Sequence, residues 1–504
     1  MTTLWTSNGG RVGLGDLPVV TGEMLRDHCV ALDANGARLI AAMPLASASP
    51  GGAREAVAVF ADDARNRLAL CRVRFTAGGR YPSVTAALPA AQAVERELWE
   101  ELGVVPEGHP WLKPLRAHPE LSAGAAAPGG GGAQARHPFF RVEGSGVHEV
   151  AVGPVHAGII EPGHFRLQCR GEEVLSLELH LGYQRRGAER ALVAASPHLR
   201  VAIAESLAGD GAVGHVLAQC RAMEALAEVE VPLAAQVLRG VALELERLAC
   251  HAGDLGALAG DVGYLPGASW FGRLRGEFLN LLLELSGSRF GRGLIVPGGV
   301  RFSLGAARRG ALIERLERAE KDLRESAEVM FGAASVLSRF EGTGVVSRDA
   351  ALDLGLVGPV ARASGVSRDV RRDHPHGIYR FAIIPVAAGE TGDVMARAMV
   401  RWLEIQRSLV FVREQLAEYR EGPLAVPAGA AAPDTVAVAL VEGWRGEILH
   451  LAATGADGAL AAYKAVDPSF HNWFGLTIAL RGNQVSDFPL CNKSFNLSYA
   501  GHDL

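Results

Sequence analysis

A Gly- and Ala-rich run, SAGAAAPGGGGAQ, occupies residues 122–134 and divides the chain into a short N-terminal part and a long C-terminal part. Gly adds backbone freedom, and neither Gly nor Ala supplies a large side chain for packing, so such a run is typical of a linker. We therefore predict a domain at residues 1–121, a linker at residues 122–136 and a second domain at residues 137–504.

The N-terminal part alternates strand-like and helix-like patterns. Apolar runs enriched in Val, Leu and Phe predict three strands, and a helical pattern is closed by Gly103, a residue that commonly ends helices. The strands fall at residues 38–43, 56–60 and 68–75, and the helix at 91–102. These elements predict a small α+β domain.

The C-terminal part opens with two strand-like runs in residues 153–178, separated by Gly171 and Glu172 at a hairpin tip. Apolar residues then recur at three- and four-residue steps, which predicts helices. These segments are 201–226, 231–251, 311–330 and 393–419. The predicted fold class is α+β, with a small N-terminal α+β domain and a mainly α domain that begins with a β-hairpin or small sheet.

Two segments of the C-terminal part, a polar helix face and a low-complexity stretch, have local structural interpretations. Arg397, Arg401 and Glu404 share one helix face, where they form either an ion-pair network or a solvated polar surface. The Ala- and Pro-rich residues 425–433 are expected to form a surface loop.

Charge and cysteine content exclude several classes of protein. The 50 basic and 55 acidic residues are interspersed, so no basic stripe for a nucleic acid exists and we expect no nucleic-acid partner. The six cysteines occur singly without a CxxC pair, which favours a reducing compartment over a disulfide framework. No apolar window reaches the length of a membrane span, so we expect a soluble chain or one held at a membrane by other subunits.

Polar side chains gather near the start of the second domain. Residues 153–167 read GPVHAGIIEPGHFRL, and Pro and Gly would place His156, Glu161 and His164 on a loop. Such groups are plausible proton carriers near neutral pH, although the histidines could equally well only satisfy backbone groups of a turn. Shortly downstream, Arg185 and Arg186 lie within one helical turn of Glu189 and could pair with it.

Ordered motifs then carry a resemblance. The run GPVHAGIIEPGHFRL, followed by GEEVLSLELHLGYQRRGAERAL, resembles the large subunits of formate hydrogenlyase-type NiFe hydrogenases and the 49-kilodalton subunit of respiratory complex I. Further matching motifs follow in order as far as residue 470. They are ELER (244–247), PGGV (297–300), GTGVVS (342–347), GPVARASGVSRD (358–369), GDVMAR (392–397), EGWRGE (442–447) and DPSF (467–470).

The N-terminal domain resembles a complex I subunit as well. ERELWEELG (95–103) followed by GHP (108–110) is similar to the end of the 30-kilodalton subunit, which such hydrogenase subunits carry as a fusion. The resemblance implies a peripheral, cytoplasmic subunit of a membrane-bound complex I-like or hydrogenase-4-like oxidoreductase. It implies an iron-sulfur small subunit and membrane-arm subunits as partners. NAD and the iron-sulfur clusters are then expected on partner subunits, since no GxGxxG follows a strand here.

The resemblance also indicates what this sequence lacks. The family's hydrogenases hold nickel and iron with two CxxC pairs, but here those positions read Ala208 and Gly211, then Asn496 and Tyr499. We therefore expect neither a metal site nor a cofactor bound by this chain, and an active hydrogenase is not expected. The quinone-binding His and Tyr of complex I fall on Ile160 and Gly209, which weakens quinone as a substrate without excluding it.

Four candidate catalytic residues remain around the former metal cavity. They are His156, His164, Asp210 and His215. The alternative is a vestigial cavity lined by leftover polar residues, in a non-catalytic scaffold or coupling subunit of a cation-translocating membrane complex.

A second polar group has a structural or a proton-pathway interpretation. Arg362, Asp369 and Arg371, with Arg372, match the family's polar segment, and adjacent arginines would lower the pKa of a buried Asp369. Glu161, Arg185 and Arg186 belong to the same set of candidates. His374 and His376 flank Pro375 in a predicted loop, and their spacing identifies no further metal ligands.

Overall fold

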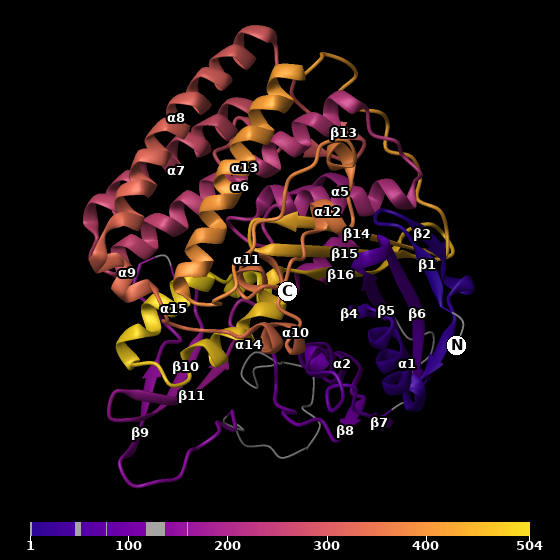
Figure 1. The fold of residues 1–504 in the computed structure, drawn as a ribbon. Helices are drawn as coiled ribbons and strands as arrows, with labels where there is room; N and C mark the ends of the chain where they lie inside the picture. The colour runs from indigo at the N-terminus through magenta and orange to yellow at the C-terminus, as the bar shows by residue number, and fades with distance from the viewer. Residues whose placement is uncertain (1–2, 46–51, 77, 117–136, 159) are drawn as a thin grey trace.

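The computed structural model describes residues 3–45, 52–76, 78–116, 137–158 and 160–504 (Figure 1). The predicted linker at 122–136 lies outside the described residues, so its conformation stays a prediction. The α+β fold class is confirmed: a β-rich N-terminal region is followed by a largely helical region with small sheets.

The N-terminal region is built on a five-stranded sheet. Four strands follow the order β1-β6-β5-β4, and β3 pairs with β6 in parallel. The predicted strands and helix are present, and the helix ends at Gly103, whose φ of +69° suits a residue without a side chain. The elements are β1 (Leu4–Thr6), β3 (Val19–Thr21), α1 (Gly22–Ala34), β4 (Ala37–Leu45), β5 (Arg54–Asp62), β6 (Arg67–Phe75), β7 (Arg80–Pro82), α2 (Gln92–Leu102) and β8 (Val105–Glu107), with 3₁₀ turns at Leu14–Asp16, Asp63–Arg65 and Pro89–Ala91.

A three-stranded antiparallel sheet, β11-β10-β9, opens the second part of the chain. Its strands are β9 (Val147–Val152), β10 (His164–Arg170) and β11 (Glu173–His180). Gly171, with φ of +59°, and Glu172 form the tip between β10 and β11, as predicted. The loop between β9 and β10 carries His156 and Glu161.

Long helices form the body of this part. The predicted helix at 201–226 is interrupted by a turn at residues 205–211, and this turn borders the candidate site. The helices are α3 (Ala188–Ala194), α4 (Pro197–Ala204), α5 (Ala212–Leu226), α6 (Leu233–Asp261), α7 (Leu265–Ser286), α8 (Ala306–Gly332), α9 (Ala334–Phe340), α10 (Arg348–Asp353), α11 (Gly358–Ala363), α12 (Val370–Asp373), α13 (Val394–Glu418), α14 (Pro468–Leu480), α15 (Phe488–Phe495) and α16 (Tyr499–His502). 3₁₀ turns occur at Gly377–Arg380 and Val485–Asp487, and a two-stranded ribbon joins β12 (Ile295–Val296) to β13 (Gly299–Val300).

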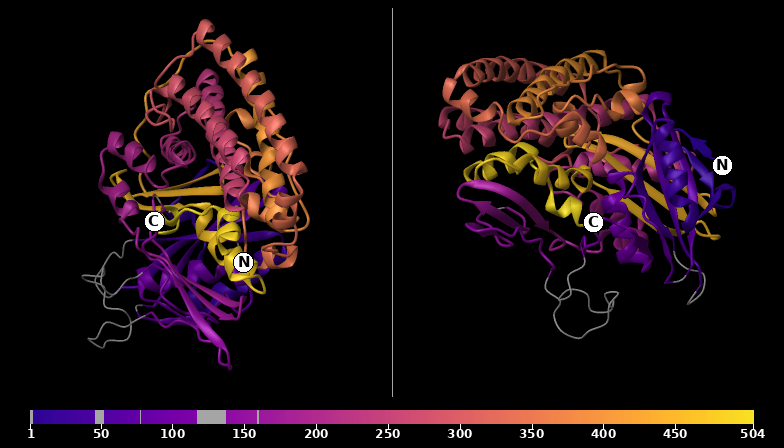
Figure 2. Two further views of the ribbon diagram at one scale, coloured as in Figure 1. Left: turned by 90° about the vertical axis from the view of Figure 1, so that its left-hand side faces the viewer. Right: turned by 60° about the horizontal axis from the view of Figure 1, so that its bottom comes forward.

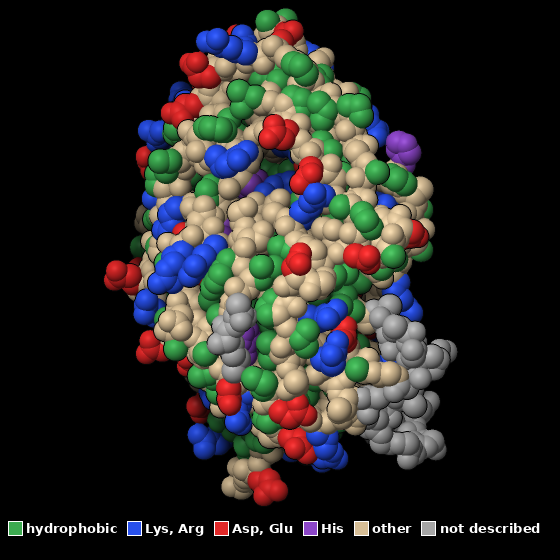
Figure 3. Space-filling model, turned by 90° about the vertical axis from the view of Figure 1, so that its right-hand side faces the viewer, with side chains coloured by type: hydrophobic (Ala, Val, Ile, Leu, Met, Phe, Trp, Pro, Cys, Tyr) green, Lys and Arg blue, Asp and Glu red, His purple; other side chains and the backbone are tan. Residues whose placement is uncertain are grey.

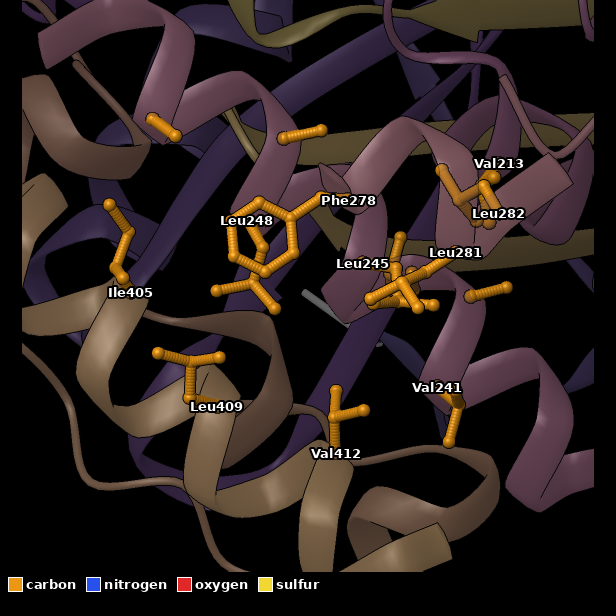
Figure 4. Close-up of a cluster of buried hydrophobic side chains, with 14 of the residues drawn as sticks. Val213, Val241, Leu245, Leu248, Phe278, Leu281, Leu282, Ile405, Leu409 and Val412 are labelled. Carbon is orange, nitrogen blue, oxygen red and sulfur yellow. The ribbon is translucent and has the colours of Figure 1, made fainter. Parts of the chain in front are cut away.

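Helix α6 is the centre of the helical layer. It packs against α7 and α13, and all three contribute to one hydrophobic cluster. Figure 4 shows Leu245 and Leu248 of α6 facing Phe278 of α7 and Ile405 of α13. Burial of such side chains contributes on the order of 2 kcal/mol each to folding. This packing fixes the position of α6, which also carries polar residues of the candidate site.

A four-stranded sheet lies beside the helices, and its C-terminal strands were not predicted. Its order is β16-β15-β14-β2, with β2 (Arg11–Gly13), β14 (Thr435–Gly443), β15 (Gly446–Thr454) and β16 (Leu460–Val466). Every residue of β14 and β15 is buried, so these strands lack the alternation of apolar and polar residues that identifies a half-exposed strand. Figure 2 shows α6, α7, α8 and α13 together on one side of this sheet.

The two parts of the chain are joined through this sheet. Strand β2 of the N-terminal part pairs antiparallel with β14, Val12 lying opposite Val436. Residues of the N-terminal sheet and of β14 and β15 also belong to one hydrophobic cluster. The boundary predicted at residues 122–136 therefore does not separate two independent sheets, although the domain division itself stays a prediction.

The surface carries charges of both signs. Figure 3 shows acidic and basic side chains interspersed over one face, with a hollow in its upper half. Within the part of the chain that the structure describes, no helix combines the length and apolarity needed to span a bilayer.

Candidate functional site

The β9–β10 loop is fixed against the C-terminal end of the chain. Glu161 accepts hydrogen bonds from the backbone N–H groups of Tyr499 (3.1 Å) and Ala500 (3.0 Å) at the start of α16. His156 Nε2 lies 2.9 Å from the Gly163 carbonyl, and His164 Nδ1 lies 3.2 Å from the Gly153 carbonyl. Both histidines thus have one ring nitrogen occupied by backbone of this loop, as the turn-satisfying interpretation predicts.

The two segments predicted to correspond to the hydrogenase cysteine pairs, residues 205–215 and 494–499, come together at Arg445. This residue lies in the turn between β14 and β15. Its Nη1 and Nη2 donate to the Asp210 carboxylate at 2.6 and 2.8 Å, and its Nε donates to the Asn496 carbonyl at 2.5 Å. Burial opposes the charge on Arg445, but Asp210 outweighs it and raises the arginine's pKa. An ion pair therefore occupies the position between these segments.

The hydrogen-bond chain continues from Asn496 into the helical layer. Asn496 ends α15 with φ of +46°, and its side-chain amide donates to Asp254 Oδ1 of α6 at 2.6 Å. Asp254 Oδ2 in turn accepts from Arg401 Nε of α13, also at 2.6 Å. Asp210, Arg445, Asn496, Asp254 and Arg401 form a continuous series, which we call the Arg445 chain.

The turn that carries Asp210 is held from several sides. Its backbone carbonyl accepts from Trp444 Nε1 at 2.9 Å and lies 3.4 Å from the Cys250 sulfur. Burial raises the pKa of the Cys250 thiol, so this sulfur stays protonated near neutral pH. The Arg445 guanidinium stacks on the Trp444 ring at 3.9 Å. The side chain of Asp210 itself remains about one third exposed (36%).

Glu246 holds the start of α5, immediately after this turn. Its carboxylate accepts from the backbone N–H groups of Val213 (2.7 Å) and Gly214 (3.1 Å). Burial raises the pKa of Glu246 to about 8, and the negative charge of Asp210 adds to the effect. Glu246 is consequently a buried carboxyl group that can hold a proton at neutral pH beside the candidate site.

His215 begins a buried polar series of its own. Its Nε2 lies 3.0 Å from Asp467 Oδ2, and its Nδ1 lies 3.1 Å from His450 Nε2. His450 Nδ1 lies 2.7 Å from the Tyr463 hydroxyl. Burial opposes ionisation of Asp467, but the bond to His215 outweighs it and lowers the pKa of Asp467 to about 2. The series is fully buried and joins α5 to the four-stranded sheet.

Behind the Arg445 chain lies a layer of buried ions between α6, α13 and β14. Arg362 donates to Glu404 at 2.6 Å and to Glu442 at 2.8 Å. Arg371 donates to Asp369 at 2.6 Å and to Glu244 at 3.1 Å. We call these six residues the buried ionic layer. Several paired charges with additional hydrogen bonds are the arrangement in which burial of ions is tolerated.

The surroundings shift the pKa values of two acids of this layer, Asp369 and Glu442, in opposite directions from their usual values. Burial opposes ionisation of Asp369, but the guanidinium groups of Arg371 and Arg362 outweigh it and lower the pKa of Asp369, as predicted from the sequence. Glu442 behaves differently, because burial and the nearby Asp369 charge raise its pKa to about 7. The pKa values of Glu244 and Glu404 are also lowered, so three acids of the layer stay charged and only Glu442 among its six residues can change its protonation near neutral pH.

Two sequence-based pairings were wrong. Arg185 pairs with Glu101 of α2, and Arg186 donates to the carbonyls of Ser206 and Leu207, whereas Glu189 accepts from Lys464. The three residues therefore do not pair within one helical turn. Each of them instead ties a different part of the chain to the region around α3.

The face formed by Arg397, Arg401 and Glu404 is not a solvated surface. All three side chains are buried, because α13 lies between α6 and the C-terminal helices. Arg401 and Glu404 pair with Asp254 and Arg362, whereas Arg397 donates to Ser494 and to two carbonyls. The predicted polar network therefore forms, but it connects different helices rather than neighbours on one helix.

The structure brings together only part of the predicted site. Asp210 lies in the turn before α5 and His215 lies in the first turn of α5, while His156 lies on the β9–β10 loop. His164 was predicted to lie on this loop but instead begins strand β10. Arg445, Glu246 and Asp254 were missed as individual site residues. A charged residue within an otherwise apolar run was the signal that could have identified them. Burial of an unpaired charge is costly, so such a residue is expected to have a partner. Among the described residues, no three His, Cys, Asp or Glu side chains are grouped closely enough to hold a metal ion.

Comparisons with known proteins identify relatives of both parts of the chain. Residues 22–125 match the 30 Kd subunit of respiratory-chain NADH dehydrogenase, and residues 261–435 match its 49 Kd subunit. The carbon monoxide-induced hydrogenase of Rhodospirillum rubrum is 31% identical over 350 residues, which cover 69% of this chain and 97% of the relative. The chain belongs to this family. It joins 30-kilodalton and 49-kilodalton complex I segments in one polypeptide and is related to hydrogenase large subunits.

Two further relatives define how far the likeness extends. Formate hydrogenlyase subunit 5 of Escherichia coli is 30% identical over 438 residues, covering 84% of this chain and 77% of the relative. A solved structure of the membrane-bound sulfane sulfur reductase, described as an archaeal respiratory membrane complex, contains a chain with a TM-score of 0.67 and 24% identity. The match covers 71% of this chain and 98% of that one, and it establishes a shared fold.

Proposed function

We propose that the chain is a peripheral subunit of a membrane-bound oxidoreductase complex related to respiratory complex I and hydrogenase-4, and that it works without a nickel-iron centre. Membership in the family supports the first part. The observation that supports the second part is the Arg445 chain, in which an arginine joins the two segments where the resemblance places the metal-binding cysteines of hydrogenases.

The side chains around Arg445 do not fit a nickel-iron centre. Such a centre needs soft thiolates from two cysteine pairs, and the aligned positions hold Ala208, Gly211, Asn496 and Tyr499. The Asn496 amide is committed to Asp254, and the Asp210 carboxylate to Arg445. The nearby Cys250 is a single buried thiol whose pKa is raised.

The partners follow from the same proposal. An iron-sulfur small subunit would contact the β9–β10 loop, where Val155 is 85% exposed. Membrane-arm subunits would hold the assembly on the cytoplasmic side of the membrane, with NAD and the iron-sulfur clusters bound by other subunits. The matches to both the 30 Kd and the 49 Kd subunits of respiratory-chain NADH dehydrogenase support this assignment, because those two subunits belong to one assembly.

Quinone reduction and pure coupling are the two activities open to such a subunit. For quinone, His156 would have to offer Nδ1, because Nε2 is occupied by Gly163. The Arg445 chain favours the second activity, in which the former cavity is closed and the subunit transmits conformational change to a cation-translocating membrane partner. The buried ionic layer would supply the rigid connection for such transmission.

Purification of the native assembly from its membrane tests the proposal. We expect a co-purifying iron-sulfur subunit, membrane subunits and far less than one nickel per chain in elemental analysis. Stoichiometric nickel would overturn the absence of the centre, and a lone monomer would overturn the subunit assignment.

Variants of the same assembly separate the two activities. Loss of quinone-dependent electron transfer in His156→Ala or Asp210→Ala, with Asp457→Ala at an exposed turn as the matched control, would identify quinone reduction. Turnover like that of the wild type in both variants, together with impaired ion translocation in Asp210→Ala, would identify coupling.

A further inference from the structure

A cavity of about 820 Å³ lies apart from the Arg445 chain and is lined by four segments. These segments are residues 7–11 at the β1–β2 turn, 221–231 at the end of α5, 236–240 of α6 and 375–380. Its volume falls within the range of small-molecule sites. The face seen in Figure 3 is hollowed, and Lys or Arg and His side chains are visible inside the hollow.

Arg221 is a half-buried cation of this cavity that forms no ion pair with an acidic side chain among the described residues. Its guanidinium donates to Asn8 Oδ1 at 3.1 Å, to the Leu440 carbonyl at 2.8 Å and to the Asn8 carbonyl at 3.3 Å. These neutral acceptors fix its position without compensating its charge. Burial lowers the pKa of Arg221 to about 9, because the nearby Glu224, which is paired with Arg239, only partly offsets the loss of solvation.

The other charged groups that line the cavity are mostly paired with one another. Arg239 donates to Glu224 at 3.1 and 2.6 Å, and Arg11 lies 2.6 Å from Glu228. Arg380 and Glu230 are exposed residues of opposite charge. Arg221 is therefore a half-buried cation of the cavity that has no ion-pair partner among the described residues.

His376 supplies a second, independent observation. It lines the same cavity, is only 4% exposed, and its Nε2 is buried without a hydrogen-bond partner among the described residues. Gln236, which also lines the cavity, has a buried Oε1 that likewise lacks a hydrogen-bond partner among the described residues. Buried polar atoms are nearly always hydrogen-bonded in native proteins, so unpaired ones beside a cavity indicate a missing acceptor or donor.

We infer that this cavity binds a small anion, whose carboxylate or phosphate group accepts hydrogen bonds from Arg221 and from His376 Nε2. Arginine presents several fixed donors to such groups, and a charge-assisted bond in a buried setting is stronger than one between neutral groups. The exposed Arg380 would draw the anion towards the cavity, while Gln236 would contact a donor on the rest of the ligand. The inference does not depend on the proposed function, because the cavity excludes Asp210 and Arg445.

Titration of the purified full chain with potassium phosphate and with potassium citrate tests this site. Thermal unfolding is followed at constant ionic strength, with potassium chloride as the reference salt. We expect one or both anions to raise the unfolding temperature saturably. Preference for phosphate or for citrate identifies which group the site takes. A response no larger than that to chloride overturns the inference.

Variants locate the binding. Arg221→Gln and His376→Gln should each weaken the anion at least tenfold, and Arg380→Gln, an exposed change that should not disturb folding, should weaken it severalfold. Arg407→Gln is the matched control, because this half-buried arginine does not line the cavity and donates to the Pro385 carbonyl instead. The inference is overturned if Arg380→Gln and at least one of the variants Arg221→Gln and His376→Gln bind the anion as tightly as the wild type. It is also overturned if Arg407→Gln loses as much affinity as they do, because the anion would then bind elsewhere.

Discussion

Arg445 donates through both terminal nitrogens to the carboxylate of Asp210, across 2.6 and 2.8 Å, in a two-bond ion pair. The same arginine holds the backbone carbonyl of Asn496 at 2.5 Å. Two segments nearly 300 residues apart in the sequence are thereby joined by one side chain. A single positive charge is thus the bridge between these two segments.

Removal of this arginine should destabilise the fold. In Arg445→Met the Asp210 carboxylate and the Asn496 carbonyl lose their donor, so we expect a loss of about 2–3 kcal/mol, below the full value for a buried pair because Asp210 is partly exposed. Urea unfolding at pH 7 measures it. Arg186→Met, which removes bonds to carbonyls only, is the control, and an equal loss in both variants would contradict the special role of the pair.

The buried histidine series should depend on His215. In His215→Phe, Asp467 loses the donor to its Oδ2 and His450 loses its partner at Nε2, which we expect to cost roughly 2–3 kcal/mol of unfolding free energy. The double variant His215→Phe with Asp467→Leu should recover part of the loss, because it removes the stranded charge. Chemical unfolding of the two variants checks this, and no recovery would contradict it.

Stability should fall as the pH rises through neutrality. Glu246 has a raised pKa of about 8, so the folded chain holds a proton that the unfolded chain releases above about pH 4.5. Its contribution is full below that pH and is lost as the pH rises through 8, and the raised pKa of Glu442, about 7, acts with the same sign. Buried neutral histidines such as His450, whose pKa is lowered, make stability rise with pH only up to about pH 6.5, and above that pH their contribution is constant.

Measurements between pH 6.5 and 8.5 therefore isolate the acids. We expect the unfolding free energy of the wild type to decrease over this range, with Glu246→Gln decreasing less, by up to about 1.4 kcal/mol for each pH unit. Glu314→Gln, on the exposed side of α8, should follow the wild type. A wild-type curve that is flat or rises with pH would show that Glu246 is ionised in the folded chain.

The helical layer should be sensitive to cavities. Phe278→Ala removes a fully buried ring between α6 and α13, so we expect a loss of about 3–5 kcal/mol. Val329→Ala, on the exposed face of α8, should change stability by less than about 0.5 kcal/mol. Thermal and urea unfolding of both variants give the comparison, and similar losses would mean that this layer is not the core.

Much of the fold could be predicted from local patterns. The strands at β4, β5 and β6, helix α2 with its terminal Gly103 and the hairpin tip at Gly171 follow from periodicity and turn residues, which are properties of neighbouring residues. Strands β14 and β15 could not be recognised in this way. They are buried on both faces, so their apolar runs carry no period of two.

The site was harder to predict, for a physical reason. Asp210 and His215 could be located by their distance from aligned motifs, but their partners Arg445 and Asp467 lie more than 200 residues further along the chain. Pairing across such distances is decided by how α5, α6 and the four-stranded sheet pack. The pairing of Arg185 and Arg186 with Glu189 failed for the same reason, because near neighbours in sequence found distant partners instead.

Strand β2 has a consequence for how the polypeptide is made. It completes the sheet by pairing with β14, and Asn8 just before it bonds Leu440, 432 positions later. A ribosome must therefore synthesise most of the protein before the first residues can reach their final place. Contacts of such long range slow folding. Strand β2 thus cannot take its place before β14 has formed, so its pairing reports on whether a strand made more than 400 residues later is correctly placed.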